Sequence, residues 1–205
     1  MKYLISIFLI LFFLQTSFAQ NSIAIKGGIG TSMIYIKNSN RKIDLDFIAT
    51  QHFGISKKIA INNTFDLLLD LQWSNKGGKL IFENSYSTVN FSYLSLPIYL
   101  NYKLNHFRFG FGVDPSVKLY TRVNGLFLDA KQIALFENTF SNNVDISLFT
   151  NQTFEWRNFF IENRIGLGLM PLTNNNITDE NGQDLLVSKT GKNIWLQLSL
   201  GYFFR

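Results

Sequence analysis

The sequence predicts an all-β protein, an eight-stranded antiparallel up-and-down β-barrel that spans a membrane. The 205 residues are 46% hydrophobic and 16% aromatic, but only 16% are charged. This charge content is low for a soluble domain, while a mean hydropathy of +0.07 is too low for a bundle of membrane helices. Apolar and polar residues alternate along several segments, and the connections between them alternate between short and long. These three observations select the barrel.

The N-terminus predicts a secretory signal peptide. Lys2 is followed by an apolar run from Tyr3 to Leu14, and Ser17 and Ala19 place small residues before a cleavage site after Ala19. A transmembrane anchor is the alternative, but the run is shorter than the ~20 apolar residues that a helical span needs. We expect residues 1–19 to be removed and residues 20–205 to form one barrel domain. The chain has no cysteine, which excludes disulfides, thiolate metal sites and a lipid-anchored N-terminal Cys.

Eight segments carry a strand pattern, and four of them alternate with period two over about ten residues or more. The four strong segments are 65–74, 94–103, 107–119 and 194–205, and the four weaker ones are 22–37, 47–58, 144–154 and 159–172. A tilted membrane strand needs ~9–11 residues, whereas strands of soluble sheets mostly have about 5–6. The lengths therefore favour strands that cross a bilayer.

The connections between these segments alternate strictly in length. Short ones cover 59–63, 104–106 and 155–158, and longer polar ones cover 38–44, 75–90, 121–143 and 173–193. Short periplasmic turns and long outer loops are typical of bacterial outer-membrane barrels. A soluble secreted barrel of lipocalin type is the alternative, but it would have mostly short hairpins and a more charged exterior. The sequence therefore predicts a location in the outer membrane.

The polar side of the predicted strands carries seven charged residues, which we expect in the barrel lumen. They are Asp66, Asp70, Arg108, Asp114, Lys118, Glu162 and Arg164. An eight-stranded barrel has an interior that side chains fill, and an unpaired buried charge is strongly destabilising. We therefore expect a network of salt bridges that holds the barrel shut. A narrow ion path or proton relay is the alternative role of the same residues.

Basic residues gather at the end with the short connections. They are Lys57, Lys58, Lys103, Arg157 and Arg205, with Arg108 close by. Long basic side chains reach the membrane interface, so we expect this rim to contact phospholipid phosphates; ordinary solvated charge is the alternative. Aromatic residues are interpreted as girdles at the membrane interfaces. These are Trp73, Phe91, Tyr93, Tyr102, Tyr120, Tyr202, Phe203 and Phe204.

Candidate catalytic and ligand-binding features are few. A metal site or a Ser-His hydrolase would need His52 or His106, the two histidines, beside a carboxylate and a serine. The glycines of residues 27–30 lack the Lys-Ser/Thr ending and the helix of a phosphate loop. The basic residues do not form a patch with stacking aromatics, so nucleic acid is not expected. We predict no catalytic, cofactor or metal site, and hence a protein that is not an enzyme.

Four segments resemble the PorT-like outer-membrane β-barrel family of Bacteroidota. Residues 70–78 resemble its third strand, with a Leu-x-aromatic-Ser-x-Lys-Gly pattern, and residues 93–103 its fourth, with a Tyr-Leu-x-(Ile/Leu)-Pro core. Residues 110–115 fit the Gly-rich fifth strand and residues 200–204 the terminal strand. The chain departs from the family where 145–153 lacks glycines and where an arginine follows the closing aromatic residue.

The resemblance implies an eight-stranded barrel without shared catalytic residues. One member of that family takes part in assembling the type IX secretion machinery. We therefore expect a structural, accessory or assembly role, with outer-membrane lipid and other envelope proteins as partners. The alternatives are a small channel or transport protein and, less favoured, a lipid-modifying enzyme embedded in the barrel.

Overall fold

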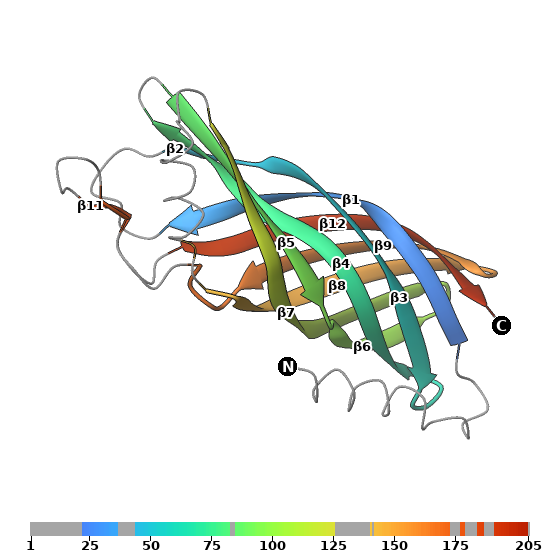
Figure 1. Cartoon of the computed structure of the whole chain (residues 1–205). Coiled ribbons are helices and arrows are strands. Elements are labelled where there is room, and N and C mark those ends of the chain that lie inside the picture. Colours follow the sequence, from blue (N-terminus) through green and yellow to red (C-terminus); the bar gives the residue numbers. More distant parts are fainter. Residues whose placement is uncertain are drawn as a thin grey trace.

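The computed structural model describes residues 22–36, 44–82, 85–125, 140, 142–172, 177–178, 184–186 and 191–204. The predicted signal peptide and the rim residue Arg205 lie outside these ranges. Within them no helix is long and apolar enough to cross a membrane. The strands form a closed antiparallel ring, seen obliquely in Figure 1. This confirms the predicted eight-stranded up-and-down barrel.

Each ring strand pairs with its neighbour in the chain, and the first and last strands close the ring. The bounds are β1 (Ser22–Ile36), β3 (Ile48–Ala60), β4 (Phe65–Phe82), β5 (Ser85–Ser95), β6 (Ile98–Leu104), β7 (Phe107–Gly125), β8 (Val144–Trp156), β9 (Phe159–Gly168) and β12 (Gly191–Phe204). β5 and β6 both lie between β4 and β7 and form one ring strand. The interruption falls at Leu96 and Pro97, since proline has no backbone N–H for the ladder.

Residues 75–90 are not the loop that the sequence predicted. β4, up to Phe82, and β5, from Ser85, pair there as a hairpin, in register from Gln72 opposite Ser95 to Phe82 opposite Ser85. The short strand β2 (Asp44–Asp46) pairs with the outer end of β4. This hairpin projects beyond the ring at the upper left of Figure 1. Its outward face is mostly polar, although it includes Ile81 and Tyr86, so the outward row of apolar residues that marks a membrane strand is interrupted there.

Side chains alternate between a buried lumen and an exposed apolar exterior. On β8 the burial alternates without interruption, so that Phe149 is 3% exposed and the preceding Leu148 is 47% exposed. Large apolar residues such as Phe111, at 66%, are among the most exposed on the outer wall. The alternation of burial therefore shows the predicted parity, with polar side chains directed into the lumen. A soluble protein rarely exposes so much contiguous apolar surface as this outer wall does.

Three aromatic residues of the predicted girdles lie inside instead. Phe91 and Tyr93 are on the inward side of β5, and Phe203 is on the inward side of β12. The prediction is wrong for these three because it used residue type without the parity of each strand. Tyr102, Tyr120 and Phe204 are exposed on the outer wall; Trp73 and Tyr202 are half-buried there.

Tight turns close two of the hairpins at one end of the barrel. β6 and β7 are joined by Asn105 and His106, and β8 and β9 by Arg157 and Asn158. Asn105 and Arg157 adopt positive φ values of 53° and 57°. Two-residue hairpin loops require this left-handed region because their twist must match that of the strands. In the third short connection, the side chain of Asn62 accepts hydrogen bonds from the amides of Thr64 and Phe65.

Neighbouring glycines of β1 offer a test of how closely the strands approach. A Cβ atom on Gly28 would lie 1.9 Å from the carbonyl oxygen of Leu198, which the backbone holds in place, whereas one on Gly27 would meet nothing nearer than 3.5 Å. We expect Gly28→Ala to lower the free energy of unfolding by about 1–3 kcal/mol. Gly27→Ala should change it by less than about 0.5 kcal/mol. Urea unfolding followed by tryptophan fluorescence measures both, and equal effects would contradict the prediction.

Candidate functional site

The middle of the lumen holds a cluster of four charged side chains, which we call the central layer. Lys26 Nζ lies 2.6 Å from Asp70 Oδ2 and 2.9 Å from Glu162 Oε1. Arg164 contacts the same two carboxylates, at 2.6 Å from Asp70 Oδ2 and 2.9 Å from Glu162 Oε1. Tyr99 donates a hydrogen bond of 3.0 Å to the second oxygen of Glu162. All four charged side chains are at most 1% exposed, so the layer is cut off from water.

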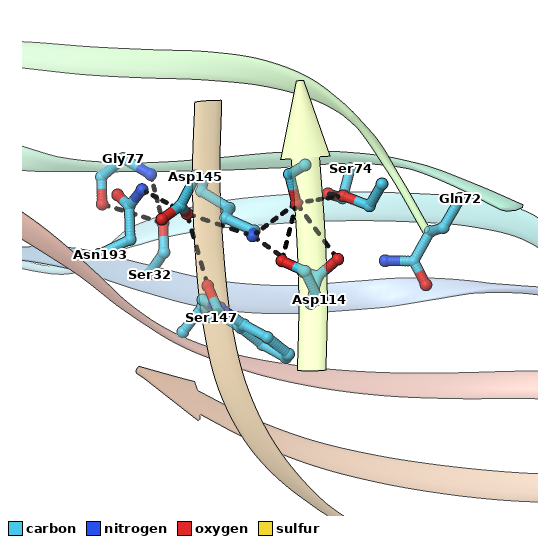
Figure 2. Close-up of polar contacts among 12 residues, drawn as sticks. Ser32, Gln72, Ser74, Gly77, Asp114, Asp145, Ser147 and Asn193 are labelled. Carbon is cyan, nitrogen blue, oxygen red and sulfur yellow. Dashed lines mark hydrogen bonds and ion pairs between the residues drawn. The ribbon is translucent and has the colours of Figure 1, made fainter. Parts of the chain in front are cut away.

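A second cluster, the outer layer, lies toward the long-loop end and surrounds one lysine. Lys76 Nζ contacts Asp114 at 2.9 Å and Asp145 at 3.5 Å. Figure 2 shows both aspartates turned toward this ammonium group, with serine hydroxyls around them. Asn193 also donates a hydrogen bond to Asp145, at 3.3 Å. The ammonium group lies 5.1 Å from the centre of the Tyr93 ring, within cation–π range.

A third cluster, the inner layer, lies at the end with the short turns. Asp66 contacts Lys103 at 3.0 Å and Arg108 at 3.2 Å. Arg108 also forms an ion pair with Glu155 at 2.9 Å, and Lys58 forms an ion pair with the same carboxylate at 3.2 Å. The side chains of Lys103 and Arg108 are 19% and 12% exposed, so this layer is the most open of the three.

Six of the seven predicted lumen residues belong to these layers, and Lys118 does not. Asp66 and Arg108 are in the inner layer, Asp70, Glu162 and Arg164 in the central layer, and Asp114 in the outer layer. Lys118 follows the outer layer along β7. There it donates a hydrogen bond to the carbonyl of Phe140 and lies over the Phe91 ring.

Four ionic partners were missed by the sequence analysis, each because its strand signal was weak. Lys26 precedes a run of glycines, and Lys76 falls in the segment predicted as a loop. Asp145 starts a weak strand, and Glu155 was assigned to a turn. Extending the period-two pattern from the strong segment 65–74 would have placed Lys76 on the inward side, and extending it from the weaker segment 144–154 would have done the same for Glu155.

The predicted basic rim is corrected for two of its members. Lys58 and Lys103 face the lumen and are held by carboxylates of the inner layer, because their positions share the inward parity of β3 and β6. Lys57 lies on the opposite face of β3 and is buried. Arg157 is exposed in the β8–β9 turn, with its guanidinium 5.1 Å from the centre of the Trp156 ring.

The long-loop end of the lumen is apolar. Beyond the outer layer, buried residues include Ile34, Leu80, Val89, Phe91 and Phe140, each at most 2% exposed. The rings of Phe91 and Phe140 meet edge to face, with centroids 5.2 Å apart. The long-loop end of the interior is therefore lined by hydrocarbon, whereas the short-turn end combines the charges of the inner layer with a buried apolar cluster of Ala24, Phe160 and Phe203.

One histidine contacts a serine inside the barrel. His52 Nε2 lies 2.7 Å from Ser199 Oγ, and both residues are buried. The other ring nitrogen, Nδ1, has no hydrogen-bond partner among the described residues. A Ser-His hydrolase needs a third group to orient the imidazole and an opening for its substrate.

His106 lies in a turn beside Phe154. In the described part of the chain, no group of three or more His, Cys, Asp or Glu side chains could hold a metal ion.

Comparison with known proteins agrees with this architecture. Residues 18–174 match the family described as outer membrane protein beta-barrel domain. A search of curated protein sequences finds no match. Among solved structures, Neisserial surface protein A (NspA) is similar with a TM-score of 0.51 and 8% identity, over 90% of this chain and 99% of that one.

Two further solved structures cover most of this chain with lower TM-scores. The Yersinia pestis attachment invasion locus protein Ail, in complex with the heparin analogue sucrose octasulfate, has a TM-score of 0.45 and 13% identity over 90% of this chain and 99% of its own. The Escherichia coli outer membrane protease OmpT has a TM-score of 0.41 and 10% identity over 93% and 99%.

The central layer gives a direct stability prediction. Asp70→Ala removes the carboxylate that lies between Lys26 and Arg164, and leaves two buried cations with one carboxylate. Breaking a buried ion pair from one side costs about 3–5 kcal/mol, so the free energy of unfolding should fall by that amount. Arg122→Ala, at an exposed position of β7, is the control and should change it by less than about 0.5 kcal/mol. Equal urea midpoints for the two variants would show that the layer does not hold the barrel together.

Proposed function

Because this chain belongs to the outer-membrane β-barrel domain family, we propose that it is a closed, non-enzymatic barrel with a structural, accessory or assembly role in the outer membrane. The observation that carries the proposal is the filling of the lumen by the three ionic layers. A solute on its way through would have to separate Lys26 and Arg164 from two carboxylates that no water reaches. The long-loop end is further closed by apolar side chains.

The absence of enzymatic activity is proposed from the surroundings of His52. Its contact with Ser199 is enclosed by the barrel wall, and no carboxylate accepts a hydrogen bond from its second nitrogen among the described residues. A substrate would have to enter between ion-paired side chains before it could reach the serine. The pair is better explained as one more hydrogen bond of the lumen core.

The β4–β5 hairpin is the part of the barrel best suited to contact a partner. Its outer half carries polar side chains on the outward face, including Asn75, Lys79, Thr88 and Asn90. Lys79 lies over the Tyr86 ring at 4.5 Å, which holds a cation beside an exposed aromatic group. An assembly role of the PorT-like kind, in Bacteroidota, would place an envelope protein against this face.

A small channel is the second candidate, and the polar character of the lumen favours it. The inner and central layers and the hydrogen-bonded pair Gln72 and Gln197 line the interior over much of its length. A rearrangement of these side chains would create a wet path. The two candidates differ in whether the folded barrel conducts ions.

We expect the purified barrel to give no conductance steps in a planar lipid bilayer, because the central layer leaves no continuous path. Incorporation is checked by flotation with vesicles and by the shift of the folded protein on unheated gels. A variant with Tyr99→Ala and Arg164→Ser removes two of the largest buried side chains and is the matched control for an opened lumen. Regular steps from the unaltered protein would favour the channel.

The proposed contact between the β4–β5 hairpin and an envelope protein is tested by photo-cross-linking in native membranes. A photoreactive amino acid at Thr88, on the outward face of β5, should give a discrete cross-linked protein band. The same amino acid at Thr150, exposed on the outer wall of β8 among apolar residues, should contact lipid and give none. If neither position captures a protein, or both capture the same set, the hairpin has no specific partner.

A further inference from the structure

The lipid-facing wall contains an apolar groove near the short turns. It has a volume of about 720 Å³ and crosses β1, β12, β9 and β8. Its lining includes Ile25, Gly27, Trp156, Ile161 and Leu200. Most of the lining side chains lie on the outward parity of their strands, so the groove opens toward the membrane. Lys26 of the central layer is also part of the lining, but its side chain points into the lumen and is buried there.

Gly27 is the residue that leaves the groove hollow. It occupies an outward position of β1 between Ile25 and Ile29, where the strand otherwise carries large apolar side chains. A Cβ atom there would make only ordinary contacts, at 3.5 Å or more, and the φ angle is not one that favours glycine. Neither packing nor backbone geometry therefore requires a glycine at this position. Because Gly27 has no side chain, open space is left beside Leu200, the residue of β12 that pairs with Gly27.

The end of the groove toward the turns is polar and cationic. Trp156 and Phe159 flank the β8–β9 turn, and the guanidinium of Arg157 lies over the Trp156 ring. On the facing strand, the hydroxyl of Tyr202 accepts a hydrogen bond of 3.2 Å from Asn158. The groove thus has a hydrocarbon floor and, at its rim, the guanidinium group of Arg157. An apolar floor with a cation at one end is complementary to an amphiphile that has a hydrocarbon chain and an anionic head group.

We propose that this groove binds one anionic glycerophospholipid of the periplasmic leaflet. An acyl chain lies along the floor formed by Gly27, Ile161 and Leu200, and the phosphate lies beside Arg157 at the membrane surface. Short turns of outer-membrane barrels face the periplasm, so head and chain have the correct orientation. The inference depends on the membrane location and not on the closed lumen, so either can fail without the other.

Quenching of Trp156 by brominated lipid tests the site. Trp73→Phe removes the other tryptophan of the outer wall, and Trp195 is buried in the lumen, so quenching by bromine in the bilayer reports on Trp156. Phosphatidylglycerol with a brominated acyl chain is compared with brominated phosphatidylcholine, each as a minor component of phosphatidylcholine vesicles. One cation near an anionic lipid corresponds to about fivefold preference. We expect phosphatidylglycerol to quench at a correspondingly lower mole fraction and to saturate.

Three variants in the same background separate the site from general lipid contact. Gly27→Leu fills the groove and should abolish the saturable quenching, while Ala49→Leu adds the same bulk to an exposed outward position of β3 and should not. Arg157→Gln should remove the preference for phosphatidylglycerol and leave quenching by phosphatidylcholine unchanged.

Quenching that follows the bulk mole fraction equally for both lipids would overturn the proposal, as would equal behaviour of Gly27→Leu and Ala49→Leu. If Gly27→Leu does not fold, as judged by migration on unheated gels, Arg157→Gln decides: an unchanged lipid preference then disproves the site.

Discussion

Pairing of buried charges is the constraint on which the rest of this barrel depends. Six cations and six carboxylates meet in the inner, central and outer layers, and each group has a partner of opposite sign within the lumen. Burying such groups is costly unless they are paired and hydrogen-bonded. The pairing therefore requires every contributing strand to keep its register, since a slip of one residue would turn a charge into the lipid.

The lumen stabilises the barrel, whereas the outer wall is the surface available for contacts with partners. Because charges and hydrocarbon fill the interior, specific contacts are left to the exterior. Two features of the exterior are suited to such contacts: the polar face of the β4–β5 hairpin and the apolar groove at Gly27. They lie at opposite ends of the barrel, which separates a contact with envelope proteins from a contact with phospholipid.

Alternation made the barrel predictable, and it also explains what could not be predicted. Where lipid covers one face, as from Phe65 to Trp73, period two reveals both the strand and its inward side, so Asp66 and Asp70 were placed correctly. Where the hairpin leaves the membrane, the outward face becomes mostly polar and the inward face carries Leu80, Val89 and Phe91. The outward apolar stripe ends there, and Lys76 was assigned to a loop. Residue type alone misled for Phe91 and Lys58, because only the parity of a strand tells which way a side chain points. The groove depends on the shape of four neighbouring strands, so Gly27 alone, in a weak strand segment, did not reveal it.

The central layer draws its members from strands far apart in the chain: Lys26 from the first, Asp70 from the third in the ring, and Glu162 and Arg164 from the next to last. Lys26 cannot meet Glu162, 136 positions later, until β12 has paired with β1. A half-built sheet in the bilayer therefore lacks the Lys26–Glu162 pair, and this part of the ionic energy is gained only at the final closure. Folding into the membrane is then cooperative, and a truncated or misregistered chain is left with an unstable, open edge.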